Sequence, residues 1–258
     1  MAKTIIPVTD LNQKPIPVIP RNFGQNLLRA SQLLFNEEVK ILKKQDNWLY
    51  VAALEQYVFI SKKWKPYEGW VKIEAIGEGR ISPKFVVCQT EGIYPYGTYL
   101  ETPLPETRQL SKHLNRQQLI EEAYLFLDTP YLWGGRSSYL SNPVASVDCS
   151  GLINLLYRAQ GLMIPRNAHD QFLFGKQIHD LQPGDPLYFA RDKRISHVIL
   201  KLEEDLFIEA PSSGKAIRLL RLGKEIEEKK GEWRIFDSPH VYKGYPISLE
   251  RSDQCLFK

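Results

Sequence analysis

The spacing of apolar residues changes character partway along this 258-residue chain. Between about Asn26 and Ile76, apolar and polar residues alternate in the runs EEVKILKK, NWLYVAAL, QYVFISKKW and EGWVKIEAI. A period of two is typical of strands with one buried face, so this part is predicted to be a small antiparallel barrel or sandwich. From Arg116 onwards the spacing becomes helical. The fold must therefore join an all-β unit to a unit that begins with helices.

The second unit is predicted to be an α+β domain. RQQLIEEAYLFL, which starts at Arg116, carries apolar residues at helical spacing. A second helix is predicted to begin at Cys149 and to end at Gly161, because glycine commonly terminates helices. The runs DPLYFAR, ISHVILKL, DLFIEA and AIRLLRL follow, and tight turns join them. Helices that precede a strand meander predict helices packed on an antiparallel sheet.

These patterns divide the chain into three parts. We predict a β-barrel domain over residues 1–78, a structured linker over residues 79–115 and the helix-and-sheet domain over residues 116–258. The linker is rich in Gly, Pro, Thr and Ser, yet its runs FVVCQT and GTYLET are typical of strands. The densest charge run, Glu225–Arg234, is predicted to be a solvated surface loop.

Composition and charge exclude several classes of protein. Hydrophobic residues make up 43% of the chain and charged residues 25%, which excludes disordered and fibrous classes. The net charge of +4 is scattered, so nucleic acid is not expected as a partner. We find neither the apolar core of a signal peptide nor the roughly 18 apolar residues of a membrane span, so we expect a cytoplasmic protein without a membrane partner. The oligomeric state cannot be predicted.

The cysteine pattern indicates a reactive thiol more than a disulfide framework. The chain has three widely spaced cysteines, no CxxC pair and no HExxH, so we predict no disulfide framework, no metal and no other cofactor. Cys149 follows Asp148 where a helix is predicted to begin. Aspartate is a good N-cap, and the free N–H groups and dipole at this helix end favour a thiolate. A small apolar residue packed in the core is the alternative for this cysteine.

Two further groups complete a candidate nucleophilic site. His197 lies in the apolar run ISHVILKL, and Glu209 lies in DLFIEAP. If these runs pair as a hairpin through the turn EED, both side chains lie on one face. Cys149, His197 and Glu209 would then be nucleophile, base and orienting acceptor, with a core histidine as the alternative for His197. The other histidines are predicted to lie at the surface: His113, His169, His179 and His240.

Several of these motifs occur together in a known family. DCSGL, the upstream YLWGG and the downstream IPRNAHDQ, LQPGDPLYF and ISHVIL resemble, in order and spacing, the NlpC/P60 cysteine peptidases over Arg116–Phe236. SQLLFNEEVKIL, DNWLYVAAL and YEGWVKIEAI resemble a bacterial SH3-like (SH3b) domain. Together the two modules are similar to the cytoplasmic γ-D-glutamyl-L-diamino acid endopeptidases of the dipeptidyl-peptidase VI type. The resemblance implies a papain-like NlpC/P60 catalytic domain preceded by a small SH3-like β-barrel.

The resemblance also implies roles for individual residues. It assigns the nucleophile to Cys149 and the base to His197. The third member is usually a histidine, and Glu209 stands in its place, so we expect retained activity with an altered pH dependence. The implied substrate-binding residues are Asp148 and Ser150 for the free amine of an N-terminal L-alanine, Tyr131 and Trp133 for the cleft walls, Tyr67 and Glu37 from the N-terminal domain, and Arg166 and Asn167, which replace the family's common Arg followed by Asp or Ser.

The function implied is that of a cysteine endopeptidase. Such an enzyme hydrolyses the γ-D-glutamyl-diamino acid bond of murein peptides that carry a free N-terminal L-alanine. The SH3b domain is expected to block one end of the cleft, so the implied substrates are small peptides in cell-wall recycling. A thiol acyltransferase and a non-catalytic murein-binding module are the alternatives.

Overall fold

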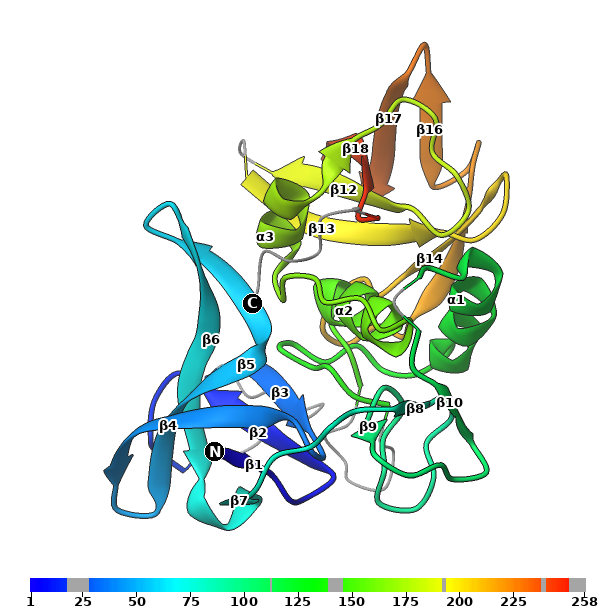
Figure 1. Cartoon of the computed structure of the whole chain (residues 1–258). Coiled ribbons are helices and arrows are strands. Elements are labelled where there is room, and N and C mark those ends of the chain that lie inside the picture. The colour runs from blue at the N-terminus through cyan, green and yellow to red at the C-terminus, as the bar shows by residue number, and fades with distance from the viewer. Residues whose placement is uncertain (18–27, 112, 139–145, 192–193, 238–239, 251–258) are drawn as a thin grey trace.

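The computed structural model of the chain describes residues 1–17, 28–111, 113–138, 146–191, 194–237 and 240–250. An N-terminal sheet, blue to cyan in Figure 1, and a C-terminal sheet, yellow to red, lie on either side of the helix α2 (Cys149–Ala159). No helix in these described ranges combines the length and apolarity that a membrane crossing requires.

The N-terminal part is all-β, as the alternation predicted. Its seven strands are antiparallel in the order β3-β2-β6-β5-β4-β1-β7, and they enclose a core that includes Leu11, Leu33 and Val51. The strands β1 and β2 precede Asn26, where the sequence pattern first suggested strands. Likeness to an SH3b barrel stays a prediction. The strands are β1 (Ala2–Thr4), β2 (Val8–Asn12), β3 (Arg29–Leu34), β4 (Glu38–Gln45), β5 (Trp48–Ile60), β6 (Lys63–Lys72) and β7 (Ile76–Glu78), with a 3-10 turn η2 (Ile73–Ala75) before β7.

Residues 79–115 contain a three-stranded antiparallel sheet of order β10-β8-β9. Val86, Tyr96 and Tyr99 from this segment are buried in the same apolar cluster as the helices that follow. The segment is thus packed against the C-terminal half, and the three-part division of the chain stays a prediction. Its strands are β8 (Phe85–Val87), β9 (Tyr99–Leu100) and β10 (Thr107–Gln109).

In the part of the chain that the structure describes, three helices precede the C-terminal sheet. Two were predicted: α1 (Arg116–Ala123), which continues as a 3-10 turn η3 (Tyr124–Phe126), and α2. Gly161 has φ +76°, so the left-handed turn expected after α2 is present. The third, α3 (Ala168–Phe174), was not predicted, because its seven residues are too few for a clear helical period.

The C-terminal sheet is antiparallel throughout, in the order β15-β14-β13-β12-β18-β17-β16, with β11 beside β18. The prediction of a loop over Glu225–Arg234 is wrong, because β16 and β17 form a hairpin there. Charged residues fill its outer face and hide the alternation, whereas Ile226 and Trp233 are buried. The strands are β11 (Lys176–Gln177), β12 (Pro186–Arg191), β13 (Arg194–Lys201), β14 (Leu206–Glu209), β15 (Arg218–Arg221), β16 (Ile226–Lys229), β17 (Glu232–Asp237) and β18 (His240–Ser248).

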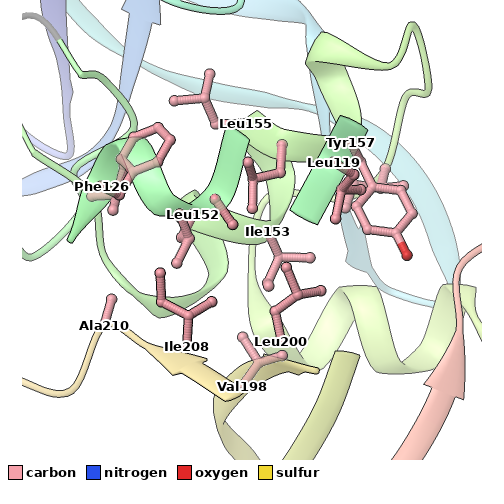
Figure 2. Close-up of a cluster of buried hydrophobic side chains, with 14 of the residues drawn as sticks. Leu119, Phe126, Leu152, Ile153, Leu155, Tyr157, Val198, Leu200, Ile208 and Ala210 are labelled. Carbon is pink, nitrogen blue, oxygen red and sulfur yellow. The ribbon is translucent and has the colours of Figure 1, made fainter. Parts of the chain in front are cut away.

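The α2 helix is the centre of the C-terminal core. Leu152 and Ile153 of α2 pack with Val198 of β13 and Ile208 of β14 (Figure 2). Ten of the eleven residues of α2 are buried, which is unusual for a helix and leaves it little freedom to shift. Burial of this extent fixes the start of α2, where Cys149 lies.

Buried ion pairs join the N-terminal sheet to the C-terminal half. Arg136 donates to the carboxylate of Glu37, and each side chain is only 1% exposed. Arg158 of α2 pairs with Glu55 of β5. Burial alone raises the pKa of Glu37, but Arg136 and Arg158 outweigh it and hold that pKa below its usual range. The two halves therefore share charges that neither half could bury alone.

Glu37→Gln tests the weight of this interface. We expect the free energy of unfolding to fall by about 3 kcal/mol, because Arg136 would remain buried without a balancing charge. The matched control is Asp205→Asn, which removes an exposed pair with Arg221 and is expected to cost less than about 1 kcal/mol. Urea unfolding of both variants measures the difference, and equal losses would contradict this account.

Candidate active site

A cleft of about 1060 Å³ lies between the two halves of the chain. Tyr67 of β6 lines it from the N-terminal side, and Cys149, His197 and Glu209 line it from α2, β13 and β14. The structure thus brings the three predicted catalytic side chains into one cavity, although they come from three separate elements.

Cys149 lies in the first turn of α2, as predicted. The Asp148 side chain caps this helix by accepting from the Gly151 N–H at 2.6 Å. A Cβ atom on Gly151 would lie 2.2 Å from the carbonyl oxygen of Gly135, so only glycine allows the YLWGG segment to approach the helix this closely. The DCSG and YLWGG motifs are therefore two sides of one contact, with the partly buried thiol at its edge.

A β-bulge shapes the strand that carries His197. Phe189 pairs with His197 and Ala190 pairs with Ile195, so Ser196 is the extra residue in β13. The imidazole stacks on the Phe189 ring at a centroid distance of 6.3 Å. Bulges commonly re-aim a side chain beside an active site, and here the bulge lies next to the catalytic candidate.

Glu209 lies diagonally across from His197 on the neighbouring strand β14, as the hairpin prediction required. Its Oε1 is 3.2 Å from His197 Nε2. At this distance the Glu209 carboxylate forms an ion pair with the ring when the ring is protonated. Since Nε2 faces Glu209, Nδ1 is the ring nitrogen left for Cys149.

Electrostatics favour the protonated imidazole. Burial lowers the pKa of His197, but contacts with Cys149 and Glu209 outweigh burial and raise that pKa to about 10. At neutral pH the ring is therefore an imidazolium beside the sulfur. Such a ring stabilises a thiolate and holds a proton that a leaving group needs.

Glu209 has a second partner that the sequence did not reveal. Burial raises the pKa of Glu209, but His197 and Arg218 outweigh it and hold that pKa below its usual range. Arg218 of β15 places its Nε 3.1 Å from Glu209 Oε2. The pairing of β14 with β15 sets these two residues opposite each other, and no sequence motif predicted this contact.

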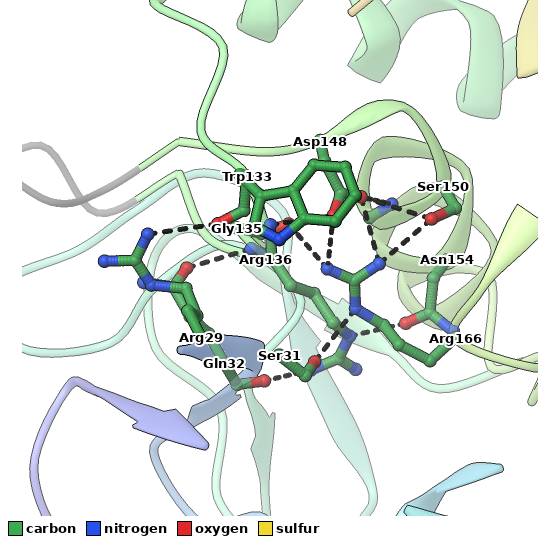
Figure 3. A network of polar contacts seen from close by, with 12 residues as sticks. Arg29, Ser31, Gln32, Trp133, Gly135, Arg136, Asp148, Ser150, Asn154 and Arg166 are labelled. Atoms are coloured by element: carbon green, nitrogen blue, oxygen red, sulfur yellow. Dashed lines mark hydrogen bonds and ion pairs between the residues drawn. The ribbon is translucent and has the colours of Figure 1, made fainter. Parts of the chain in front are cut away.

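Asp148 and Ser150 line the cleft beside Cys149, and Arg166 holds both (Figure 3). Arg166 donates to the two carboxylate oxygens of Asp148 at 3.0 and 2.9 Å and to Ser150 Oγ at 3.0 Å. The backbone N–H groups of Gly134 and Gly151 also donate to this carboxylate. Asp148 therefore organises the start of α2, and its amine-binding role stays a prediction.

The aromatic candidates also line the cleft. Trp133 is 53% exposed, whereas Tyr131 is buried. Burial, followed by the charge of Cys149, raises the pKa of Tyr131, which keeps its hydroxyl neutral near the sulfur. Tyr67 hydrogen-bonds with Asn167, so the N-terminal sheet and the segment before α3 meet at one end of the cleft.

Two predicted substrate residues do not line the cleft. Glu37 is enclosed in the interface with Arg136, and Arg166 lies 1% exposed behind Asp148. Both charges are already paired in these buried positions, and a role for either residue in substrate binding stays a prediction. Conversely, His169 of α3 is half-buried and lines the cleft. His113 and His179 are exposed as predicted, while Cys255 and the side chain of His240 lie outside the described residues.

Alkylation tests whether Cys149 differs from an ordinary thiol. Burial raises the pKa of Cys88, so Cys88 remains a thiol at pH 7 and serves as the internal control. We expect iodoacetamide to label Cys149 at least tenfold faster than Cys88, and His197→Ala to slow that labelling because the imidazolium is lost. Peptide mapping by mass spectrometry gives both rates. Equal labelling rates would contradict an activated thiol.

Comparisons with known proteins agree with this geometry. Residues 128–231 match the NlpC/P60 family. A γ-D-glutamyl-L-lysine dipeptidyl-peptidase of Bacillus subtilis is 27% identical over 242 residues, which cover 78% of each chain. A γ-DL-glutamyl hydrolase of Bacillus subtilis is 30% identical over 138 residues, covering 51% of this chain and 32% of that protein. The crystal structure of an NlpC/P60 protein from Bacillus cereus has a TM-score of 0.74 at 17% identity and covers 97% of this chain and 100% of its own, which shows a shared fold.

Proposed function

We propose that this chain is a cysteine endopeptidase acting on murein peptides, because residues 128–231 match the NlpC/P60 family. The bond cleaved joins the γ-carboxyl of D-glutamate to a diamino acid, in peptides that begin with a free L-alanine. One observation carries the proposal: the Cys149 thiol at a helix start lies in one cleft with the His197 ring, whose pKa is raised to about 10 by Cys149 and Glu209. The homology to a γ-D-glutamyl-L-lysine dipeptidyl-peptidase supports the choice of bond.

The acylation step uses the thiolate and the imidazolium in turn. The Cys149 sulfur attacks the γ-carbonyl carbon, and the negative charge moves to the carbonyl oxygen. The Gly151 and Leu152 N–H groups are bonded to Asp148, which leaves the Cys149 and Ser150 N–H groups to stabilise this oxyanion. His197 gives its proton to the leaving nitrogen as the carbon–nitrogen bond breaks. A thioester and a neutral imidazole remain.

Hydrolysis then restores the starting state. Water adds to the thioester carbonyl while the neutral His197 ring takes one of its protons. The carbon–sulfur bond breaks, sulfur leaves as a thiolate, and the γ-carboxylic acid is released. Glu209 keeps the ring oriented through both steps.

Amine recognition is assigned to the end of the cleft where Asp148, Ser150 and Tyr67 meet. A carboxylate edge and a hydroxyl suit the ammonium of an N-terminal L-alanine. Tyr67 of the N-terminal sheet lines this end, which supports small free peptides over glycan-linked wall as the substrate class. We assign the enzyme to cytoplasmic recycling of such peptides.

Product analysis tests the bond that is cut. Incubation with L-Ala-γ-D-Glu-L-lysine or its diaminopimelate counterpart is expected to release L-Ala-γ-D-Glu, as detected by mass spectrometry. Cys149→Ala should lower turnover by at least 10³-fold, because no other group supplies the nucleophile. Cleavage at the alanine–glutamate bond, or turnover by the variant, would refute the assignment.

Acetylation of the substrate tests amine recognition without altering the protein. We expect kcat/KM for the N-acetyl peptide to fall at least tenfold, about 1.4 kcal/mol, because a charge-assisted hydrogen bond is lost. Peptides that carry a free N-terminal glycine serve as the size control. If the acetylated peptide is cut as fast as the free one, the amine site is wrong.

The alternatives give different results in the same assays. An acyltransferase would pass the acyl group to an added amine in preference to water. A non-catalytic binding module would bind murein fragments equally well with Cys149→Ala and after alkylation of the thiol. Hydrolysis that is unaffected by added amines and abolished by alkylation supports the peptidase.

A further inference from the structure

Three neighbouring strands of the C-terminal sheet place a row of charged side chains on one face. His197 lies on β13, Glu209 on β14 and Arg218 on β15, and Glu209 is directly opposite Arg218 in the strand register. Oε1 of Glu209 is 3.2 Å from His197 Nε2, and Oε2 is 3.1 Å from Arg218 Nε. Each oxygen of this buried carboxylate therefore faces a different cation.

We propose that Arg218 is a positioning residue that holds Glu209 and weakens the negative potential of that carboxylate at the His197 ring, so that the ring can act as a base during thioester hydrolysis. The inference rests on the proposed peptidase mechanism and deepens it. Arg218 lies on the edge strand β15, outside every sequence motif, and would control when His197 can accept a proton.

The two chemical steps make opposite demands on His197. During acylation the ring must be protonated, and both the Cys149 thiolate and Glu209 favour that state. During hydrolysis the sulfur is bound in a neutral thioester, and the ring must accept a proton from water. Glu209 remains charged throughout and would keep the ring protonated. A neutral third member would not create this conflict.

Arg218 is placed to relieve that conflict. Its guanidinium engages the carboxylate oxygen that points away from His197, so it draws the negative charge away from the ring without touching it. The Arg218 side chain is 46% exposed on the outermost strand β15. Solvent therefore screens its field at longer range, and its effect on the ring passes mainly through Glu209.

Other ionisable groups also line the cleft near His197, but the pKa of the ring is set by Cys149 and Glu209. Besides Cys149 of α2, the elements packed against β13 bring His169 and Asp170 of α3 and Arg191 of β12 to the cleft, and β13 itself brings Arg194. The contacts that shift the pKa of His197 come from Cys149 and Glu209. Those that shift the pKa of Glu209 come from His197 and Arg218.

Titration of the ring tests the proposal without requiring catalysis. The background is Cys149→Ala, which lacks the thiolate as the acyl-enzyme does. NMR detects the His197 ring, and loss of its signal in His197→Gln assigns it. We expect Arg218→Gln to raise the ring pKa by about half a pH unit or more, Arg218→Lys to have a smaller effect, and Glu209→Gln to lower it.

Matched controls separate a specific effect from a general one. Arg221 lies on the same strand, pairs with Asp205 and is 62% exposed. Arg221→Gln therefore removes a charge from that strand and should leave the pKa of the His197 ring unchanged. Arg218→Gln should also have no effect once Glu209→Gln is present. An unchanged or lowered ring pKa in Arg218→Gln, or the same rise in both backgrounds, would overturn the proposal. Circular dichroism verifies folding, and Arg218→Met replaces any variant that unfolds.

Activity supplies a second readout that depends on the proposed function. With a hydrolysis-limited peptide, the acid limb of kcat should move to higher pH in Arg218→Gln, because more of the ring is protonated when water must be activated. An unmoved acid limb would overturn the role in hydrolysis. If wild type cuts no peptide at all, the proposed function fails, while the ring titration still decides whether Arg218 acts on His197 through Glu209.

Discussion

One guanidinium joins the parts of the chain that form the cleft. Arg166 donates to Ser31 of the N-terminal sheet, to the carbonyl of Gly135 in the YLWGG segment and to Asp148 at the start of α2 (Figure 3). Its backbone N–H bonds the carbonyl of Tyr57. The side chain is 1% exposed, so loss of these partners would leave a buried charge at a cost of several kcal/mol. The cleft geometry depends on keeping this set of contacts together.

The N-terminal sheet therefore contributes to the candidate active site. It supplies Tyr67 to the cleft and Ser31 to the arginine that fixes Asp148. Rigidity on the other side comes from α2, which is buried between the two sheets, and from the strands β13 and β14. A thiol held by a buried helix and a ring held by a bulged strand meet with little freedom, which is what an oriented nucleophile and base require.

Local patterns predicted the parts of the site that depend on local structure. Asp148 as cap, Cys149 in the first turn and Gly161 after the last turn follow from rules that act within a few residues. His197 and Glu209 were also within reach, because a short turn joins their strands. The charged hairpin at Glu225–Arg234 was missed because polar residues hid its period, and the short helix α3 was missed because seven residues are too few to show one. Arg218 was missed because strand register is not visible in the sequence, and Arg166 is 135 residues from Ser31. Local sequence patterns could not predict which buried charges pair across long separations in the chain.

In the proposed mechanism Cys149 forms the covalent bond to substrate, and His197 donates a proton to the leaving nitrogen and then accepts one from water. Acid quenching during turnover of L-Ala-γ-D-Glu-L-lysine, followed by proteolysis and mass spectrometry, locates the acyl group directly. We expect the added mass of an L-Ala-γ-D-Glu acyl group on the peptide that contains Cys149. The same mass on a peptide that lacks Cys149 would contradict it.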